Sequence, residues 1–316
     1  MDTVRDSPAV LVAGAGQVGV YAARELAQRG AKVIAVDAEP AMGYFLRFGP
    51  RVDTELLAGD IRESDALLPL IRNNNIQYVI ACAGLVGHDL SKIPEHDAWA
   101  VNVDGVRNLA EVAIASGTVR RIVYISSVAV YGEPPVPRIG EESPLAPYSE
   151  YGKTKAAAER LLLRYRAELE VRIVRSCGVY GPLRLGRGSQ SARLIEKLVV
   201  NARRGNDIVI RTTQGASDEY LYVKDLARAV AMITLHSVQQ DCYVFNVGSG
   251  IKTTCIELAA ALQEAVPTAR IKLELVDGED SKVPALDIER LRQALGFTPE
   301  FSLVEGLRDY IVEAGF

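Results

Sequence analysis

Short runs of β-branched and other apolar residues alternate with longer helical patterns through the first half of the chain. The runs cover residues 9–13, 32–36, 54–58, 78–81, 121–126 and 171–175. The helical patterns lie between them, near residues 18–29, 64–74, 95–116 and 150–168. Strands that alternate with helices pair in parallel, and an unbroken apolar run such as residues 9–13 suits a strand buried on both faces. The order predicts an α/β fold with a doubly wound parallel sheet.

The regular alternation lapses after residue 182. Residues 183–191 are rich in Gly, Arg and Ser, which is typical of a loop that borders a site. Shorter elements follow, with helices expected at residues 192–204, 223–236 and 254–265 and strands at residues 208–210, 243–247 and 271–275. We therefore expect a main domain over residues 1–182 and a smaller α/β lobe over residues 183–316, interleaved with the last strands of the sheet.

Charge and hydropathy exclude several classes of protein. The 316 residues carry 36 Lys and Arg against 40 Asp and Glu, a net charge of −4, whereas binding nucleic acid by phosphate neutralisation usually needs a basic excess. No stretch approaches the ~18 uninterrupted apolar residues of a membrane span, and the charged residues 1–7 do not form a signal peptide. We expect a soluble, cytoplasmic protein with neither a nucleic-acid nor a membrane partner.

The few sulfur and imidazole side chains are widely spaced. They are Cys82, Cys177, Cys242, Cys255, His88, His96 and His236. They contain no C-x-x-C pair, so we expect neither a disulfide framework nor a metal site.

The first apolar run leads into a glycine motif, G-x-G-x-x-G. Its members are Gly14, Gly16 and Gly19, with Gln17 and Val18 inside it, and a helical pattern follows. Glycines here permit a tight turn and a close approach of backbone N–H groups to a pyrophosphate, whose charge also favours the helix N-terminus. The motif alone is a weak signal, but its place between the first strand and the first helix predicts a Rossmann-type dinucleotide site.

Asp37 ends the second predicted strand, 18 residues after Gly19. A carboxylate at this point accepts hydrogen bonds from a ribose 2′-hydroxyl and repels a 2′-phosphate. No Arg follows it in residues 36–40. The position therefore favours NAD over NADP.

Three side chains are candidates for acid–base chemistry. Tyr151 and Lys155 are four residues apart at the start of a predicted helix and so share one face. A nearby ammonium stabilises a phenolate, so we expect a lowered pKa for Tyr151 and proton exchange with a substrate hydroxyl. Ser127 follows the strand at residues 121–126, at the sheet edge where open α/β folds bind ligands. Each signal is common alone, and their combination predicts one site.

Taken together, these motifs closely resemble those of the extended short-chain dehydrogenase/reductases, in the NAD-dependent epimerase/dehydratase family. The resemblance runs through nearly the whole chain, with matches at residues 14–19, 37, 59–61, 82–84, 102–109, 126–132, 151–155, 179–182, 220–225 and 246–250. It implies that Ser127, Tyr151 and Lys155 form a catalytic triad and that Lys155 also holds the nicotinamide ribose.

The resemblance also implies further cofactor contacts. Asp60 and Ile61 are expected to flank the adenine, and Cys82, Ala83 and Cys177 to line the cofactor cleft. Asn102 is expected either to brace the active site or to pin a helix to the sheet.

The chain departs from the family pattern at four positions. Ala13 replaces a glycine before the glycine motif, which leaves cofactor binding expected with a slightly altered turn. Ala129 stands where dehydrating and decarboxylating members place an acid, which disfavours those reactions. Gly178 and Asp218 replace an Asn and an Arg that contact the diphosphate of nucleotide sugars. Since a carboxylate repels a diphosphate, the substrate is expected to lack one unless loop arginines compensate; the candidates are Arg184, Arg187 and Arg193.

The leading hypothesis is an NAD-dependent oxidoreductase or epimerase that acts on a hydroxyl of a sugar-like small molecule. One alternative is a nucleotide-sugar (UDP-sugar) 4-epimerase, and an alternative of another class is a regulatory protein that senses NAD without chemistry. The resemblance further implies a homodimer formed through the helices at residues 95–116 and 150–168.

Overall fold

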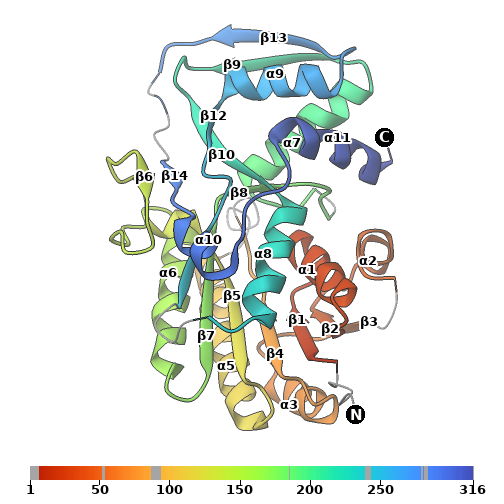
Figure 1. Cartoon of the computed structure of the whole chain (residues 1–316), viewed down its shortest axis with the longest axis vertical. Coiled ribbons are helices and arrows are strands. Elements are labelled where there is room, and N and C mark those ends of the chain that lie inside the picture. The colour runs from red at the N-terminus through yellow and green to blue at the C-terminus, as the bar shows by residue number, and fades with distance from the viewer. Residues whose placement is uncertain are drawn as a thin grey trace.

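The computed structural model describes residues 7–51, 54–86, 94–184, 186–238, 243–278, 280 and 284–315. His88 and Cys242 lie outside the described residues. Figure 1 shows a large sheet flanked by helices, with a smaller lobe at the top of the view.

Seven parallel strands form the central sheet, in the order β11-β7-β5-β4-β1-β2-β3. Their bounds are β1 Ala9–Ala13, β2 Lys32–Asp37, β3 Thr54–Ala58, β4 Tyr78–Ala81, β5 Arg121–Ser127, β7 Glu170–Ser176 and β11 Val244–Val247. All six pairings are parallel, which confirms the predicted doubly wound α/β fold. The order reverses beside β1, and such a reversal is where open sheets bind ligands.

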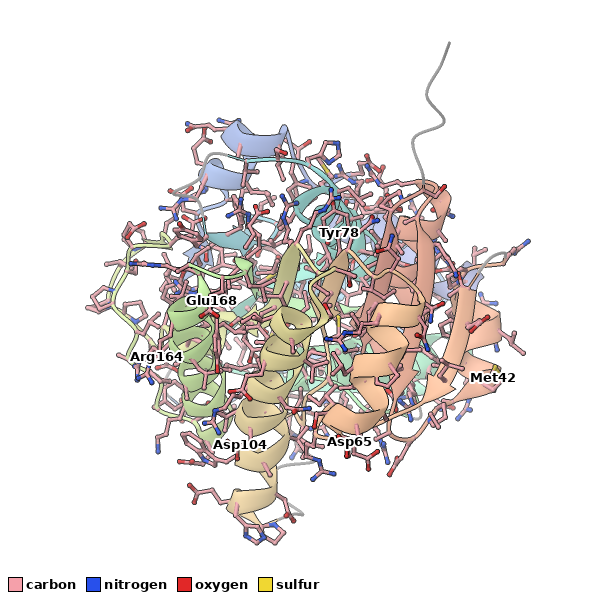
Figure 2. All side chains as sticks on the ribbon, turned by 90° about the horizontal axis from the view of Figure 1, so that it is seen from below. Met42, Asp65, Tyr78, Asp104, Arg164 and Glu168 are labelled. Atoms are coloured by element: carbon pink, nitrogen blue, oxygen red, sulfur yellow. The ribbon has the colours of Figure 1, made fainter. Side chains whose placement is uncertain are left out.

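Side chains of successive residues in each strand enter two different hydrophobic clusters. Val10 and Val12 of β1 join the cluster beneath α1 (Gln17–Gln28) and α8 (Val223–Leu235), whereas Leu11 joins the opposite cluster. That opposite face is covered by α3 (Ser64–Asn73), α5 (Gly105–Ser116) and α6 (Glu150–Leu162), which lie side by side (Figure 2). Because strand side chains alternate between faces, apolar runs were needed in the central strands. Among the described residues, no helix combines the length and the apolar character that crossing a membrane requires.

The helical pattern at residues 95–116 is divided in the structure. It begins as α4 (Glu95–Trp99), continues as a π-helical turn over Ala100–Asp104, and ends as α5. Similarly, α6 ends at Leu162 and a 3-10 turn, Leu163–Tyr165, completes the predicted segment. A π turn leaves no mark in hydrophobic periodicity, and such turns are frequent at functional sites.

The smaller lobe contains short strands that the sequence pattern missed. They are β6 (Arg138–Ile139), β8 (Gly178–Tyr180), β10 (Ser217–Tyr222), β12 (Lys252–Thr254) and β14 (Ala285–Leu286). They pair as β12-β10-β8 and β14-β6, and β9 (Asp207–Thr212) pairs with β13 (Arg270–Leu275). The helices of this half are α7 (Gln190–Arg203), α9 (Cys255–Ala265), α10 (Glu289–Leu295) and α11 (Leu303–Ala314), while α2 (Met42–Phe48) follows β2. Four of the five missed strands have only two or three residues and are too short to show an alternation, whereas β10 has six, with buried residues on both faces.

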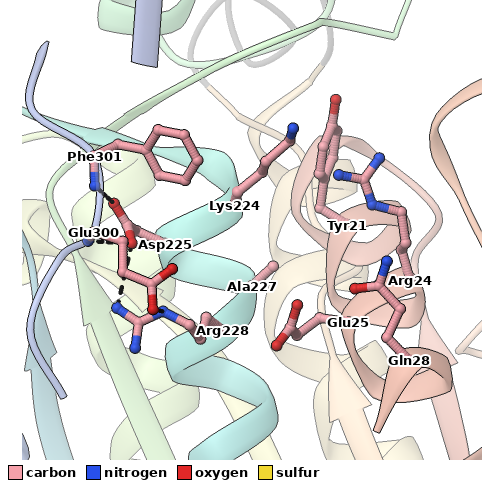
Figure 3. Close-up of a pocket in the computed structure, with 10 residues that line it drawn as sticks. All are labelled: Tyr21, Arg24, Glu25, Gln28, Lys224, Asp225, Ala227, Arg228, Glu300 and Phe301. Carbon is pink, nitrogen blue, oxygen red and sulfur yellow. Dashed lines mark hydrogen bonds and ion pairs between the residues drawn. The ribbon is translucent and has the colours of Figure 1, made fainter. Parts of the chain in front are cut away.

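Asp225, in the first turn of α8, forms hydrogen bonds with the segment that precedes α11. It is 1% exposed, and its carboxylate accepts the backbone N–H groups of Glu300 and Phe301 at 2.8 and 3.1 Å (Figure 3). Arg228 lies 3.4 Å from the same carboxylate. Burial raises the pKa of Asp225, and these contacts offset part of that rise. The buried acid therefore joins two segments that are distant in sequence.

A second buried cluster joins β5, β7 and α6. The Arg175 guanidinium contacts the Glu159 carboxylate through two nitrogens, at 3.1 and 2.7 Å, and donates to the Tyr131 hydroxyl at 2.8 Å. Ser126 also donates to Glu159. The side chains of Arg175 and Glu159 are only 6% and 1% exposed, so each charge is compensated almost entirely by the other.

We predict that Arg175→Met lowers the free energy of unfolding by about 3–5 kcal/mol, because Glu159 would keep a buried charge with no cation beside it. Urea denaturation followed by circular dichroism measures this loss. The control is Arg292→Met, whose partner Glu289 lies at the helix surface, and its loss should not exceed about 1 kcal/mol. Equal losses in the two variants would refute a special role for the buried pair.

Candidate active site

The turn from β1 into α1 requires glycine at two of its positions. Gly14 has φ +104°, and a Cβ there would lie 2.4 Å from the backbone N of Ala83. A Cβ at Gly19 would lie 1.9 Å from the Gly14 carbonyl oxygen. Gly16 is the N-cap of α1 and supplies no side-chain cap, so the N–H groups of the first turn are not satisfied by a side chain there. This geometry fits the pyrophosphate of a dinucleotide.

Asp37 lies beside this turn, at the end of β2, as the sequence predicts. Its Oδ2 accepts the backbone N–H of Ala15 at 2.8 Å, and its Oδ1 accepts that of Glu39 at 2.9 Å. The structure also shows Arg184 beside Asp37, whereas the sequence analysis had proposed Arg184 as a residue that could bind a phosphate of the substrate. The Arg184 Nη1 lies 3.0 Å from Oδ1 of Asp37.

The remaining predicted cofactor residues surround the same edge of the sheet. Ala83 donates its backbone N–H to Ala13 at 2.6 Å, and burial raises the pKa of the neighbouring Cys82 to about 12. The Gln17 side chain donates to the Gly181 carbonyl oxygen at 2.9 Å. Val18 is half-buried against the core. The thiol of buried Cys177 has a pKa well above its usual value because of that burial.

Asp60 and Ile61 follow β3 on the same side of the molecule. The Asp60 carboxylate binds the Arg62 guanidinium at 2.6 Å, and this contact lowers its pKa. Ile61 is 5% exposed, and its carbonyl oxygen accepts the Asn108 side chain at 2.7 Å. Gly105 provides the space for Ile61, since a Cβ there would lie 2.6 Å from the Ile61 Cδ1 atom.

Three elements bring the catalytic candidates together. Ser127 is the last residue of β5, and Tyr151 and Lys155 lie on the first turns of α6, which begins after the N-cap Ser149. The side chains of Ser127 and Tyr151 are hydrogen-bonded to each other. The Lys155 ammonium is 5.7 Å from the centre of the Tyr151 ring, 4.8 Å from that of Tyr124, and donates to the Ile125 carbonyl oxygen at 2.8 Å.

The sequence predicted a lowered pKa for Tyr151, but in the structure this pKa is raised. Burial raises the pKa of Tyr151 to about 12, and the hydrogen bond with Ser127 offsets only part of the rise. Burial also lowers the pKa of Lys155 to about 8, because an ammonium loses hydration in the interior. The prediction considered the Lys155 charge and left out desolvation of the phenol, which has the larger effect on the pKa of Tyr151.

Asn102 connects two segments that border the predicted site. It lies in the π-helical turn, is 1% exposed, and donates to Thr154 of α6 at 3.1 Å. Its Oδ1 accepts the Leu85 N–H at 2.7 Å, and its amide donates to the Leu85 carbonyl oxygen at 3.1 Å. A Cβ at Gly84 would lie 3.2 Å from this Oδ1 and 3.5 Å from the Lys155 Nζ. Asn102 thus ties the segment after β4 to the helix that bears the triad.

The departures from the family pattern at Gly178 and Asp218 are adjacent in space, with Ser191 between them. A Cβ at Gly178 would lie 2.9 Å from the Ser191 hydroxyl, so a larger residue would need a shift. That hydroxyl donates to the Asp218 carboxylate at 2.6 Å, and burial raises the pKa of Asp218.

Two of the three candidate arginines bind elsewhere, and Arg193 lies in α7, two residues after Ser191. Arg184 and Arg187 bind Asp37 and Glu39 instead, at 3.0 and 2.9 Å. The Nε of Arg193 is buried and has no hydrogen-bond partner among the described residues.

A small pocket between α1 and α8 is separate from this site. Tyr21, Arg24, Lys224 and Asp225 are among the residues that line it, and none of the predicted catalytic or cofactor residues does (Figure 3). Its cations are paired, since Arg24 and Lys224 both contact Glu313.

Sequence reasoning missed two residues of the site. Tyr124 lies beneath the Lys155 ammonium, and its buried hydroxyl has no hydrogen-bond partner among the described residues. Its place two residues before Ser126 on β5 was a signal, because alternate strand residues share a face and Ser126 contacts Glu159 of α6. Arg184 at the cofactor end left no signal, since the contact joins residues far apart in sequence.

Comparison with known proteins identifies the family. The profile of the NAD dependent epimerase/dehydratase family matches residues 10–248. The Low-salt glycan biosynthesis protein Agl12 of Haloferax volcanii is 28% identical over 254 residues, covering 79% of this chain and 78% of that protein. UDP-glucose 4-epimerase 2 of Oryza sativa subsp. japonica is 29% identical over 284 residues, covering 81% of this chain and 69% of that one.

A solved structure agrees with this assignment. MoeE5 in complex with UDP-glucuronic acid and NAD is 28% identical, with a TM-score of 0.80, covering 97% of this chain and 98% of that one. The profile spans most of the chain, from the glycine motif through the triad to the last strand of the sheet. The chain therefore belongs to the NAD dependent epimerase/dehydratase family and is an NAD-dependent enzyme of the extended short-chain dehydrogenase/reductase type.

Proposed function

We propose that the chain uses Tyr151, Ser127 and Lys155 to oxidise a hydroxyl-bearing carbon of a sugar or sugar-like molecule, as an epimerase or a dehydrogenase. The observation that carries this proposal is the contact of Ser127 with Tyr151 beside the buried Lys155 ammonium. These groups lie at the carboxyl end of β5, on the edge of the sheet that also bears the glycine turn. A proton-transfer group and a dinucleotide site on one edge suit hydride transfer.

Tyr151 takes the hydroxyl proton while the carbon–oxygen double bond forms. Because burial raises its pKa to about 12, the phenol is protonated before ligands bind, and it must release this proton to solvent before its phenolate can accept the substrate's proton. The Lys155 ammonium stabilises the phenolate as the proton moves. Ser127 hydrogen-bonds Tyr151 and has an oxygen that can also donate to the substrate, so it orients both.

NAD, when bound, would supply the acceptor for the hydride that leaves the carbon, and the positive charge of its oxidised ring would favour the phenolate form of Tyr151. The glycine turn, Asp37 and the Cys82–Ala83 segment would hold it. We propose that Lys155 also holds the nicotinamide ribose and that NAD binds in preference to NADP. The main domain over residues 1–182 would bind the cofactor, and residues 183–316 would mainly bind the substrate.

Epimerisation and simple oxidation begin with the same step. An epimerase returns the hydride to the other face of the carbon, whereas a dehydrogenase releases the ketone or lactone. Ala129 supplies no acid beside the triad, which disfavours dehydration. An assay of sugars, sugar acids and nucleotide sugars for net NADH and, separately, for stereochemical inversion distinguishes the two. An NAD sensor without chemistry would not need the assembled triad.

The substrate is proposed to be a free sugar, sugar acid or other polyol without a nucleotide diphosphate. The support is the pairing of Asp218 with Ser191 against Gly178, together with the engagement of Arg184 and Arg187 at the cofactor end. The second candidate is a UDP-sugar 4-epimerase, which the relative UDP-glucose 4-epimerase 2 favours.

We predict that Tyr151→Phe lowers turnover by at least ~10²-fold, the scale of a positioned acid–base group, and leaves NAD affinity nearly intact. Lys155→Ala should reduce both turnover and NAD affinity. Steady-state kinetics and cofactor titration measure the two effects. The matched control is Tyr165→Phe, beyond the far end of α6, where the hydroxyl donates to the exposed Glu111. Full activity in Tyr151→Phe would show that the mechanism is wrong.

Calorimetric titration of the NAD-loaded enzyme with UDP tests the substrate class. We predict UDP affinity at least about a hundredfold weaker than for an enzyme that contacts the diphosphate with Arg, because one charge-assisted contact is lost and a like charge added. The Asp218→Asn variant should bind UDP more tightly than the wild type. Tight UDP binding by the wild type would contradict this prediction and support the second candidate, a UDP-sugar 4-epimerase.

A homodimer through α5 and α6 stays a prediction. Ala157, Leu161 and Arg164 lie in one line at helical spacing along this part of the predicted interface. Ala157 and Leu161 are half-buried, and Arg164 is exposed. Figure 2 shows Asp104 and Arg164 on the outer side of these helices. Polar contacts would therefore supplement a small apolar patch in such an interface. Light scattering at micromolar concentration should show a dimer, and a monomer would refute it.

A further inference from the structure

The chain that leaves β8 turns back to the cofactor end of the sheet. Three contacts hold it there: Gln17 donates to the Gly181 carbonyl oxygen at 2.9 Å, Tyr44 donates to the Pro182 carbonyl oxygen at 2.7 Å, and Arg184 binds Asp37 at 3.0 Å. Gln17 belongs to the glycine motif and Asp37 to the ribose position. This segment therefore lies against both halves of the cofactor site.

Arg184 is built into the structure rather than solvated. It is 7% exposed, and besides Asp37 it donates to the Glu39 backbone carbonyl oxygen. Its Nε atom is also buried and has no hydrogen-bond partner among the described residues. A buried guanidinium with a free donor is costly unless a ligand or another group supplies an acceptor.

The Asp37 carboxylate is already well supplied with donors. Ala15 and Glu39 contribute their backbone N–H groups, and Arg184 contributes a cation. A lone carboxylate at this position would repel a ribose 2′-phosphate, whereas a carboxylate paired with an arginine forms a site of low net charge. The planar guanidinium also matches the geometry of phosphate oxygens.

We infer that Arg184 is a cofactor-specificity residue, which neutralises Asp37 at the ribose 2′ position and so limits how strongly the enzyme rejects NADP. The inference rests on the proposed binding of the adenosine ribose at Asp37. NAD remains the preferred cofactor because Asp37 still accepts its ribose hydroxyls. The chain's selectivity is then set by two residues, one from each half of the sequence.

A purely structural role for Arg184 predicts a different outcome. If the side chain only anchors residues 181–184, its loss changes the affinities for NAD and NADP by the same factor. If it neutralises Asp37, its loss weakens NADP far more than NAD. The ratio of the two affinities therefore separates the roles.

The experiment measures this ratio directly. The purified enzyme is dialysed to equilibrium against equal concentrations of NAD and NADP, the free nucleotides are removed, and the bound ones are released by denaturation and counted by chromatography. The wild type should contain more NAD than NADP. In Arg184→Met the NAD:NADP ratio should rise at least about tenfold, because the phosphate then faces an uncompensated carboxylate.

Two variants serve as controls. Arg184→Lys keeps the charge and should retain a ratio close to that of the wild type. Arg187→Met removes a neighbouring arginine that binds the exposed Glu39 side chain, and its ratio should stay within about twofold of the wild type.

Asp37→Asn supplies an independent measurement, including in the case that Arg184→Met does not fold. It leaves Arg184 without its counter-charge, so NADP should gain at least about tenfold over NAD. The Asp37→Asn, Arg184→Met double variant should lose that gain. A ratio in Arg184→Met within twofold of the wild type, or an equal NADP gain in the single and double variants, overturns the inference. If the wild type retains neither nucleotide, the proposed function itself fails.

Discussion

Parallel pairing of the seven central strands brings their carboxyl ends to one edge of the sheet, and the whole site depends on that alignment. β1 delivers the glycine turn there, β2 delivers Asp37, and β5 delivers Ser127. The reversal of strand order beside β1 leaves room at this edge for a ligand. The glycine turn, Asp37 and Ser127 each lie at the end of a strand, and the common direction of the strands brings them to one edge, where α6 adds Tyr151 and Lys155.

Buried charged groups that stabilise the fold have charged or N–H partners, whereas the buried ammonium in the candidate active site has no counter-ion among the described residues. Arg175 and Glu159 neutralise each other, and Asp225 is satisfied by backbone N–H groups and Arg228. Within the described residues no carboxylate forms an ion pair with Lys155, whose ammonium contacts a carbonyl oxygen and two aromatic rings. An ammonium with a lowered pKa and no counter-ion is costly for stability and useful beside a group that must ionise.

The arginines after β8 show how the tertiary structure assigns a role that composition leaves open. As loop residues, Arg184 and Arg187 were candidates to bind a substrate phosphate. The structure directs both to the end of β2, where Arg184 neutralises Asp37. In these pairs neither guanidinium contacts the half-buried Asp218, whose carboxylate accepts the Ser191 hydroxyl.

The sequence by itself determined the parallel sheet and the glycine turn and predicted the grouping of Ser127, Tyr151 and Lys155, because each of these signals lies within a short stretch of residues. An apolar run of five residues makes β1 a buried strand, and a spacing of four places Tyr151 and Lys155 on one helical face. Tertiary structure alone decided the π-helical turn at Asn102, the short strands of the smaller lobe, the burial that raises the Tyr151 pKa, and the contact of Arg184 with Asp37. These features arise from desolvation and from contacts between distant segments, and neither leaves a periodic pattern in the residues that make them.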